Sequence, residues 1–160
     1  MIMTAALLAA AAVAQINISK TEKATPGEEV FMDMAVTAAE TAVDQGKPAC
    51  GAVVILNGAW RAAGMADAGK TAEENAIAKS RLRSLQTASI YTVNQPTTQA
   101  LNAIMKAGAA AVYFVNSAAD VIEAGICTAA DYDESKLDPS LTPVPLHKLD
   151  YAPARKLVGK

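Results

Sequence analysis

Apolar positions in the first part of the chain recur with the period of a helix. A capping box at residues 25–28, with proline in the first turn, marks the start of a helix that should end about Gln45. Apolar residues at every fourth position predict a single face that packs on the core. These residues are Val30, Met34, Ala38 and Ala42.

The next apolar run, at residues 51–56, has the length of a strand rather than of a helix. Asn57-Gly58 follows directly, and this dipeptide favours a two-residue turn because both residues tolerate positive φ. Residues 59–65 are therefore predicted to return as the partner strand of a hairpin.

Helix and strand patterns then alternate to the end of the chain. The strand–helix–strand order predicts parallel strands joined by right-handed crossovers. Prolines in the last strand predict that it lies at a sheet edge. The predicted elements are a helix at 71–84, a strand at 89–93, a helix opened by Pro96 and ending near Gly108, a strand at 110–115, a short helix capped by Ser117, and a strand at 143–149.

Residues 1–14 form an apolar run that only Thr4 interrupts. This run is too short to cross a bilayer, which takes roughly 20 residues, so no membrane span is predicted. It ends in Ala-Val-Ala, a small-residue cleavage pattern, which predicts a signal peptide and an exported, periplasmic protein. The alternative is an alanine-rich helix on a cytoplasmic protein. Residues 15–24 are predicted to be a polar spacer and residues 25–160 the domain.

Composition and net charge indicate which classes of binding partner to expect. A length of 160 residues fits one domain with a core, and 52% of the residues are apolar but only 4% are aromatic. The formal charge is -2 and no basic stripe is interleaved with aromatic residues, so we expect no nucleic-acid partner. Cys50 and Cys127 would pair in an oxidising compartment or serve as two small buried side chains.

Two stretches of the chain have the residue spacing of a known pair of sequence motifs. Residues 71–77 read TAEENAI, and residues 91–104 read YTVNQPTTQALNAI. In their spacing they resemble the H-A-E and P-C-x-x-C motifs of the cytidine deaminase-like superfamily. Residues 48–54 resemble the first strand of that family, and residues 103–113 resemble the segment that continues from its cysteine motif. Residues 124–126 resemble the A-G-F segment of its guanine and transfer-RNA adenosine deaminase branches. The resemblance implies an α/β fold, a three-layer α/β/α sandwich with a mixed five-stranded sheet, and a homo-oligomer.

The family's chemistry depends on zinc, which lowers the pKa of a bound water to about 7 so that it can attack the base, while a glutamate moves protons. By resemblance, Glu73 stands at the position of that glutamate and Cys50 at a phenylalanine that lines the pocket. The three ligand positions hold other residues, none of which is a good zinc ligand: Thr71, Thr97 and Ala100. We therefore expect no metal and no cofactor.

Thr71 and the two glutamates that follow it, Glu73 and Glu74, also have a purely structural interpretation. Thr71 and Glu74 fit a capping box, and carboxylates are favoured in a first helical turn. Relocated zinc ligands would have to come from Cys50, Cys127 and His147, and Cys50 could instead serve as a nucleophile beside a base.

These residues favour one function over two others. The favoured hypothesis is a zinc-free pseudo-deaminase, inactive in deamination, that binds a small nucleobase-like molecule or a partner. Its pocket would consist of Thr71, Glu73, Thr97, Ala100 and Cys50. The alternatives are a deaminase-type hydrolase with relocated ligands, or one that uses Cys50, and a purely structural subunit of an oligomer.

Overall fold

The computed structural model describes residues 16–160 of the chain. The predicted signal peptide therefore lies outside the described residues. Within them, no helix is long and apolar enough to cross a membrane. The main elements are β1 (Glu22–Lys23), α2 (Pro26–Asp44), β2 (Gly51–Leu56), β3 (Ala59–Met65), α3 (Ala72–Ser80), β4 (Ala88–Asn94), α4 (Thr98–Ala107), β5 (Ala111–Asn116), α5 (Ala118–Glu123), β6 (Leu146–Asp150) and α6 (Ala152–Arg155).

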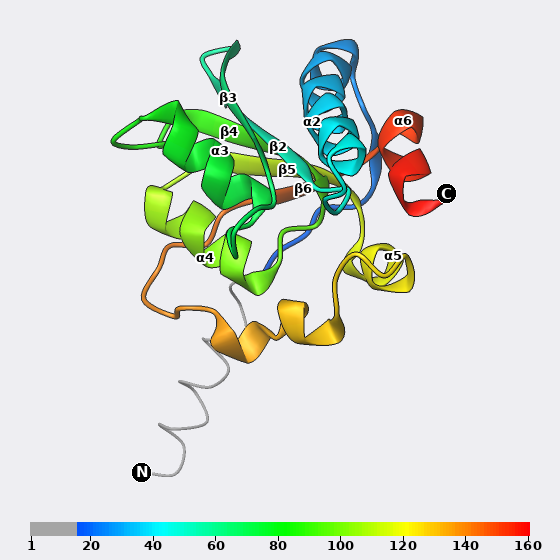
Figure 1. Cartoon of the computed structure of the whole chain (residues 1–160). Helices are drawn as coiled ribbons and strands as arrows, with labels where there is room; N and C mark the ends of the chain where they lie inside the picture. Colours follow the sequence, from blue (N-terminus) through cyan, green and yellow to red (C-terminus); the bar gives the residue numbers. More distant parts are fainter. Residues whose placement is uncertain (1–15) are drawn as a thin grey trace.

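A mixed sheet forms the middle of three layers, in the strand order β1-β6-β5-β4-β2-β3. Strand β2 runs antiparallel to β3 and β4, whereas β4, β5, β6 and β1 are parallel to one another. Helix α2 and the short α6 cover one face, and α3 and α4 cover the other (Figure 1). The three-layer α/β/α arrangement predicted from the sequence is confirmed.

The sheet differs from the prediction in two respects. It has six strands rather than five, because Glu22–Lys23 pairs with β6 as β1. Strand β6 is therefore not an edge strand. Its prolines do not break the ladder because Pro143 and Pro145 precede the strand, which begins at Leu146.

The hairpin and the helix starts follow the local sequence closely. Asn57 and Gly58 have φ values of 52° and 75°, as a tight primed turn requires. Helices α2 and α3 begin at the predicted capping boxes. Helix α3 ends earlier than predicted, at Ser80, where Arg81 adopts a left-handed conformation. Pro96 does not open α4, because the N-cap is Thr97.

The predicted buried face of α2 is wrong in most of its residues. Of the four positions in the predicted stripe, only Ala42 is buried, and Val30 is 54% exposed. The sheet instead contacts a different side of the helix, which shares only Ala42 with the predicted stripe. The residues on that side are Met32, Ala35, Val36, Ala39 and Ala42.

Candidate functional site

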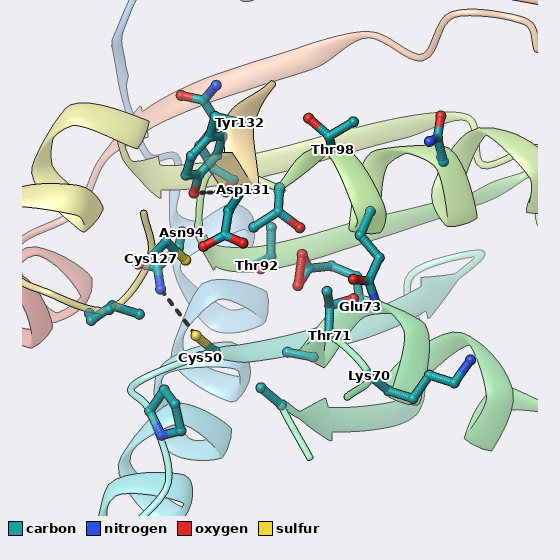
Figure 2. Close-up of a pocket in the computed structure, with 18 of the residues that line it drawn as sticks. Cys50, Lys70, Thr71, Glu73, Thr92, Asn94, Thr98, Cys127, Asp131 and Tyr132 are labelled. Atoms are coloured by element: carbon teal, nitrogen blue, oxygen red, sulfur yellow. Dashed lines mark hydrogen bonds between the residues drawn. The ribbon is translucent and has the colours of Figure 1, made fainter. Parts of the chain in front are cut away.

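A pocket opens where two helices begin and a parallel strand ends. It has a volume of about 520 Å³ and lies between the N-termini of α3 and α4, the C-terminal end of β4, and the segment 126–136. Ligands in open α/β sheets bind at the carboxyl ends of strands, where the strand order reverses. The pocket lining includes Thr97. The lining residues labelled in Figure 2 include Cys50, Thr71, Glu73, Thr92, Asn94, Thr98, Cys127, Asp131 and Tyr132.

The first turn of α3 forms one wall of the pocket. The Thr71 hydroxyl accepts from the Glu74 backbone N–H at 3.2 Å, and the Glu74 carboxylate accepts from the Thr71 N–H at 3.0 Å. Gln99, on α4, donates its side-chain amide to the same Glu74 oxygen at 2.7 Å. The predicted capping box is therefore present, and Glu74 also links the two helix starts.

The first turn of α4 forms the adjacent wall. The Thr97 hydroxyl accepts from the Ala100 backbone N–H at 3.2 Å. Ala100 is completely buried behind this turn and does not line the pocket. Thr98, the next residue after the cap, donates its hydroxyl to the Asp133 carbonyl at 3.0 Å and so ties the segment 126–136 to the helix.

Glu73 is the buried carboxyl group of the pocket. It is only 6% exposed, and Figure 2 shows it between the two helix starts. Burial raises its pKa, its own backbone N–H lowers it, and the charge of Glu74 raises it, so that the pKa lies at about 7 rather than at the ordinary 4.5. Near neutral pH, Glu73 can therefore either donate or accept a proton.

Cys50 faces the pocket from the start of β2. Asn94, at the end of β4, contacts its sulfur with a side-chain N–H at 3.7 Å and donates to the Ala49 carbonyl at 3.0 Å. Burial, followed by the charge of Glu73, raises the pKa of the Cys50 thiol to about 12. A nucleophilic cysteine needs a lowered pKa, so this environment does not favour the Cys50 nucleophile.

The buried Asn94 belongs to a network that reaches the far side of the sheet. Its side-chain carbonyl accepts from the Asn116 amide at 3.1 Å, and Asn116 also donates to the Ala154 carbonyl at 3.0 Å. Neither asparagine was singled out from the sequence. Both end a strand of the parallel pair β4 and β5, so polar residues at adjacent strand ends were the signal that could have identified them.

Cys127 and Tyr132 complete the pocket from the loop after α5. The Tyr132 hydroxyl donates to the Gln95 carbonyl at 2.7 Å and thereby fixes the loop over the end of β4. Burial raises the pKa of Cys127, and the nearby Asp131 raises it further. Both cysteines line this pocket as free thiols.

The donor set of the pocket does not fit a zinc ion. The hydroxyl groups of Thr71 and Thr97 each cap a helix, and Ala100 offers only a methyl group. His147 is remote, because it stacks on Tyr113 with ring centroids 4.8 Å apart and is absent from the pocket lining. Among residues 16–160, no group of three or more His, Cys, Asp or Glu side chains is placed to hold a metal.

Comparison with known proteins gives matches in structure rather than in sequence profile. No family model and no curated protein sequence matches the chain. The guanine deaminase of Bacillus subtilis is 30% identical, with a TM-score of 0.60 over 69% of this chain and 77% of that one. The guanine deaminase of Nitrosomonas europaea is 16% identical, with a TM-score of 0.65 over 95% and 90% of the two chains. A transfer-RNA deaminase that edits A to I at the wobble position is 21% identical, with a TM-score of 0.59 over 74% and 97%.

Proposed function

This chain belongs to the cytidine deaminase-like superfamily, and we propose that it is a zinc-free pseudo-deaminase that binds a small nucleobase-like molecule without deaminating it. The observation that carries the proposal is the chemistry of the three ligand positions. Two threonine hydroxyls are engaged as helix caps and the third position is a buried alanine. Thiolate and imidazole are the donors that hold catalytic zinc, and these positions supply neither.

The pocket itself supports ligand binding. A volume of about 520 Å³ lies within the range of small-molecule sites, and an open pocket argues against a subunit whose old site is packed shut. The buried carboxyl group of Glu73 has few hydrogen-bond partners, so it favours a ligand that offers N–H donors. Two structural neighbours were solved with such purines, 8-azaguanine and 2,6-diaminopurine.

A hydrolase with relocated ligands has less support. Cys50 and Cys127 share the pocket, but the remoteness of His147 removes the third candidate ligand. The raised pKa of Cys50 keeps it a neutral thiol near pH 7, and neutral thiols are poor metal ligands and poor nucleophiles. Glu73 therefore has a role in binding rather than in moving protons during turnover.

Equilibrium dialysis of the full chain against 2,6-diaminopurine and 8-azaguanine tests the binding proposal. We expect saturable binding with one ligand per chain. Glu73→Gln should weaken it at least about 10-fold, because a hydrogen bond to a charged group is replaced by a neutral one. Glu22→Gln, a change at an exposed carboxyl on β1, serves as the matched control. No saturable binding to either purine would contradict the proposal.

The loss of zinc is tested by metal analysis of the same protein. We expect far less than one zinc per chain and no ammonia release from guanine, cytosine or adenine. The positive control restores the family's ligands in the triple variant Thr71→His, Thr97→Cys and Ala100→Cys, which should bind one zinc. One tightly held zinc in the unaltered chain, together with ammonia release, would show that deamination persists.

A further inference from the structure

The pocket contains both cysteines of the chain, Cys50 and Cys127. Cys50 directly precedes β2, and Cys127 lies in the segment 126–136, which forms the roof of the pocket. Figure 2 shows the two side chains on the same side of the pocket as Asn94, whose amide contacts the Cys50 sulfur at 3.7 Å. Burial, then the charge of Glu73 and then that of Cys127 raise the pKa of Cys50, so the two sulfur atoms lie within electrostatic reach of each other. With two cysteines in the chain, an internal disulfide has only one possible pairing.

The wall that carries Cys50 is rigid. Cys50 lies between two buried residues, Ala49 and Gly51. The Ala49 carbonyl accepts from the Asn94 amide at 3.0 Å, and Gly51 lies directly against the backbone of α2. Buried backbone that is packed closely on both sides has little freedom to move. Cys50 therefore presents its sulfur at a fixed position in the pocket wall.

The roof that carries Cys127 is held by fewer bonds. Residues 128–131 are exposed, and in the described part of the chain the backbone–backbone hydrogen bonds of residues 127–136 join only residues close in sequence. Side chains make the connections from the roof to α4 and to the end of β4, among them those of Thr98 and Tyr132. A shift of the roof toward β2 therefore breaks side-chain hydrogen bonds and leaves the strands and helices intact.

We propose that Cys50 and Cys127 form a reversible disulfide that ties the roof to the start of β2 and closes the pocket to its ligand. A disulfide needs the two Cα atoms within about 7 Å of each other, so a bridged roof is held against β2. A ligand that enters between these two walls then binds only while the roof is open, and its apparent affinity falls in proportion to that fraction. The effect on the ligand rests on the proposed function, whereas the formation of the bond does not.

A small disulfide such as glutathione disulfide is the oxidant for this bond. The Cys127 thiol loses its proton, and its sulfur attacks one sulfur of that disulfide, which breaks the S–S bond and releases one glutathione thiolate. The Cys50 thiolate then attacks the Cys127 sulfur, forms the internal S–S bond and expels the second glutathione. Both protons end on glutathione thiols, so the two cysteines are oxidised and one glutathione disulfide is reduced. Burial, followed by the charge of Asp131, raises the pKa of Cys127, so the exchange is slow near neutral pH.

Intact mass spectrometry of the full chain without reductant tests whether the bond forms. After reduction and then incubation with glutathione disulfide at pH 8, we expect a single chain that has lost two hydrogen atoms and retains no glutathione. Hydrogen exchange of residues 126–136 should slow at least about 10-fold, because the bond holds the roof in place. Cys50→Ser should instead retain one glutathione, at Cys127. Glutathione retained on both cysteines of the parent, or a disulfide between two chains, overturns the proposal.

Equilibrium dialysis against 2,6-diaminopurine, before and after oxidation, tests whether the bond closes the pocket. The apparent dissociation constant should rise at least about 10-fold in the oxidised chain and return to its first value when dithiothreitol is added. In the double variant Cys50→Ser and Cys127→Ser, the constant should be the same with and without glutathione disulfide. An affinity that the internal bond leaves unchanged overturns the closure. If the reduced chain binds no purine, the proposed function fails, and the mass and exchange measurements still decide whether the bond ties the roof.

Discussion

Glu73 differs from its neighbour Glu74 in the partners of its carboxyl group. Glu74 closes a capping box with Thr71 and accepts from Gln99, so its charge is compensated. Within residues 16–160, the Glu73 carboxyl group is paired with its own backbone N–H alone, and it is buried. Glu74 thus has a structural role, whereas the adjacent Glu73 on the same helical turn faces the pocket.

The raised pKa of Glu73 makes stability depend on pH. Its pKa is about 7 in the folded state against 4.5 when exposed, so the folded chain holds the extra proton between these values. Stability contributed by this group is therefore complete below pH 4.5 and is lost as the pH rises to about 7. Glu73→Gln removes the cost of the buried charge. We expect its free energy of unfolding to lie within about 1 kcal/mol of the parent's at pH 5 and to exceed the parent's by about 3 kcal/mol at pH 8.

Urea unfolding at pH 5 and pH 8 measures this difference. The variant Glu22→Gln, which alters an exposed carboxyl on β1, should show the same free energy of unfolding as the parent at both values. A gap between Glu73→Gln and the parent that does not change with pH would mean that Glu73 is charged throughout this range.

The sequence predicted the candidate site only at positions that match the family's motifs. Those motifs predicted that Thr71, Glu73, Thr97 and Cys50 share one pocket, because helix starts and strand ends are local features of the sequence. The Thr98 hydroxyl and Tyr132 escaped prediction, because each acts through a contact between distant parts of the chain. No local pattern encodes such a contact.

At the scale of elements, capping boxes and the Asn-Gly turn predicted where α2, α3 and β3 begin. The faces of the elements were harder to predict. The four-residue spacing of Val30, Met34 and Ala38 predicted that these residues form the buried face of α2. The face that contacts the sheet instead includes Ala35 and Ala39. A helix with apolar residues on two sides does not reveal from sequence which of them faces its own core.

The segment 126–136 forms the pocket roof, and Asn102 of α4 fastens its end in addition to the bond from Thr98. The Asn102 amide donates to the Lys136 carbonyl at 3.0 Å, and its oxygen accepts from the Asp138 N–H at 2.9 Å. Asn102→Ala removes both bonds, and we expect the opening of residues 132–138 to become easier by about 1–2 kcal/mol. Hydrogen exchange of peptides from this segment should accelerate accordingly.

The matched control for this loop is Gln86→Ala, an exposed position in the turn before β4. It should leave exchange in residues 132–138 at the parent's rate. Equal protection in Asn102→Ala and the parent would show that Thr98 and Tyr132 hold the roof without Asn102.

At the scale of the whole molecule, two glycines set the distance between the layers. A Cβ atom at Gly51 would lie 2.3 Å from the Ala35 carbonyl oxygen of α2, and one at Gly64 would lie 2.4 Å from the Ala72 carbonyl oxygen of α3. Each helix therefore rests on the bare backbone of the hairpin, one on each face of the sheet. Because Thr71 and Glu73 flank Ala72, the position of the pocket wall depends on the contact at Gly64.

Alanine at these glycines separates the effect on stability from the effect on the pocket. Backbone atoms cannot yield as side chains do, so Gly51→Ala and Gly64→Ala should each lower the free energy of unfolding by about 3 kcal/mol. Gly27→Ala is the control, because a Cβ at Gly27 meets nothing within 4 Å and alanine favours the helix, so stability should stay level or rise by up to about 1 kcal/mol.

Purine affinity should fall in Gly64→Ala, which displaces α3, and stay unchanged in Gly51→Ala, which displaces α2. Equal losses of affinity in both would mean that the pocket responds to overall stability rather than to the position of α3.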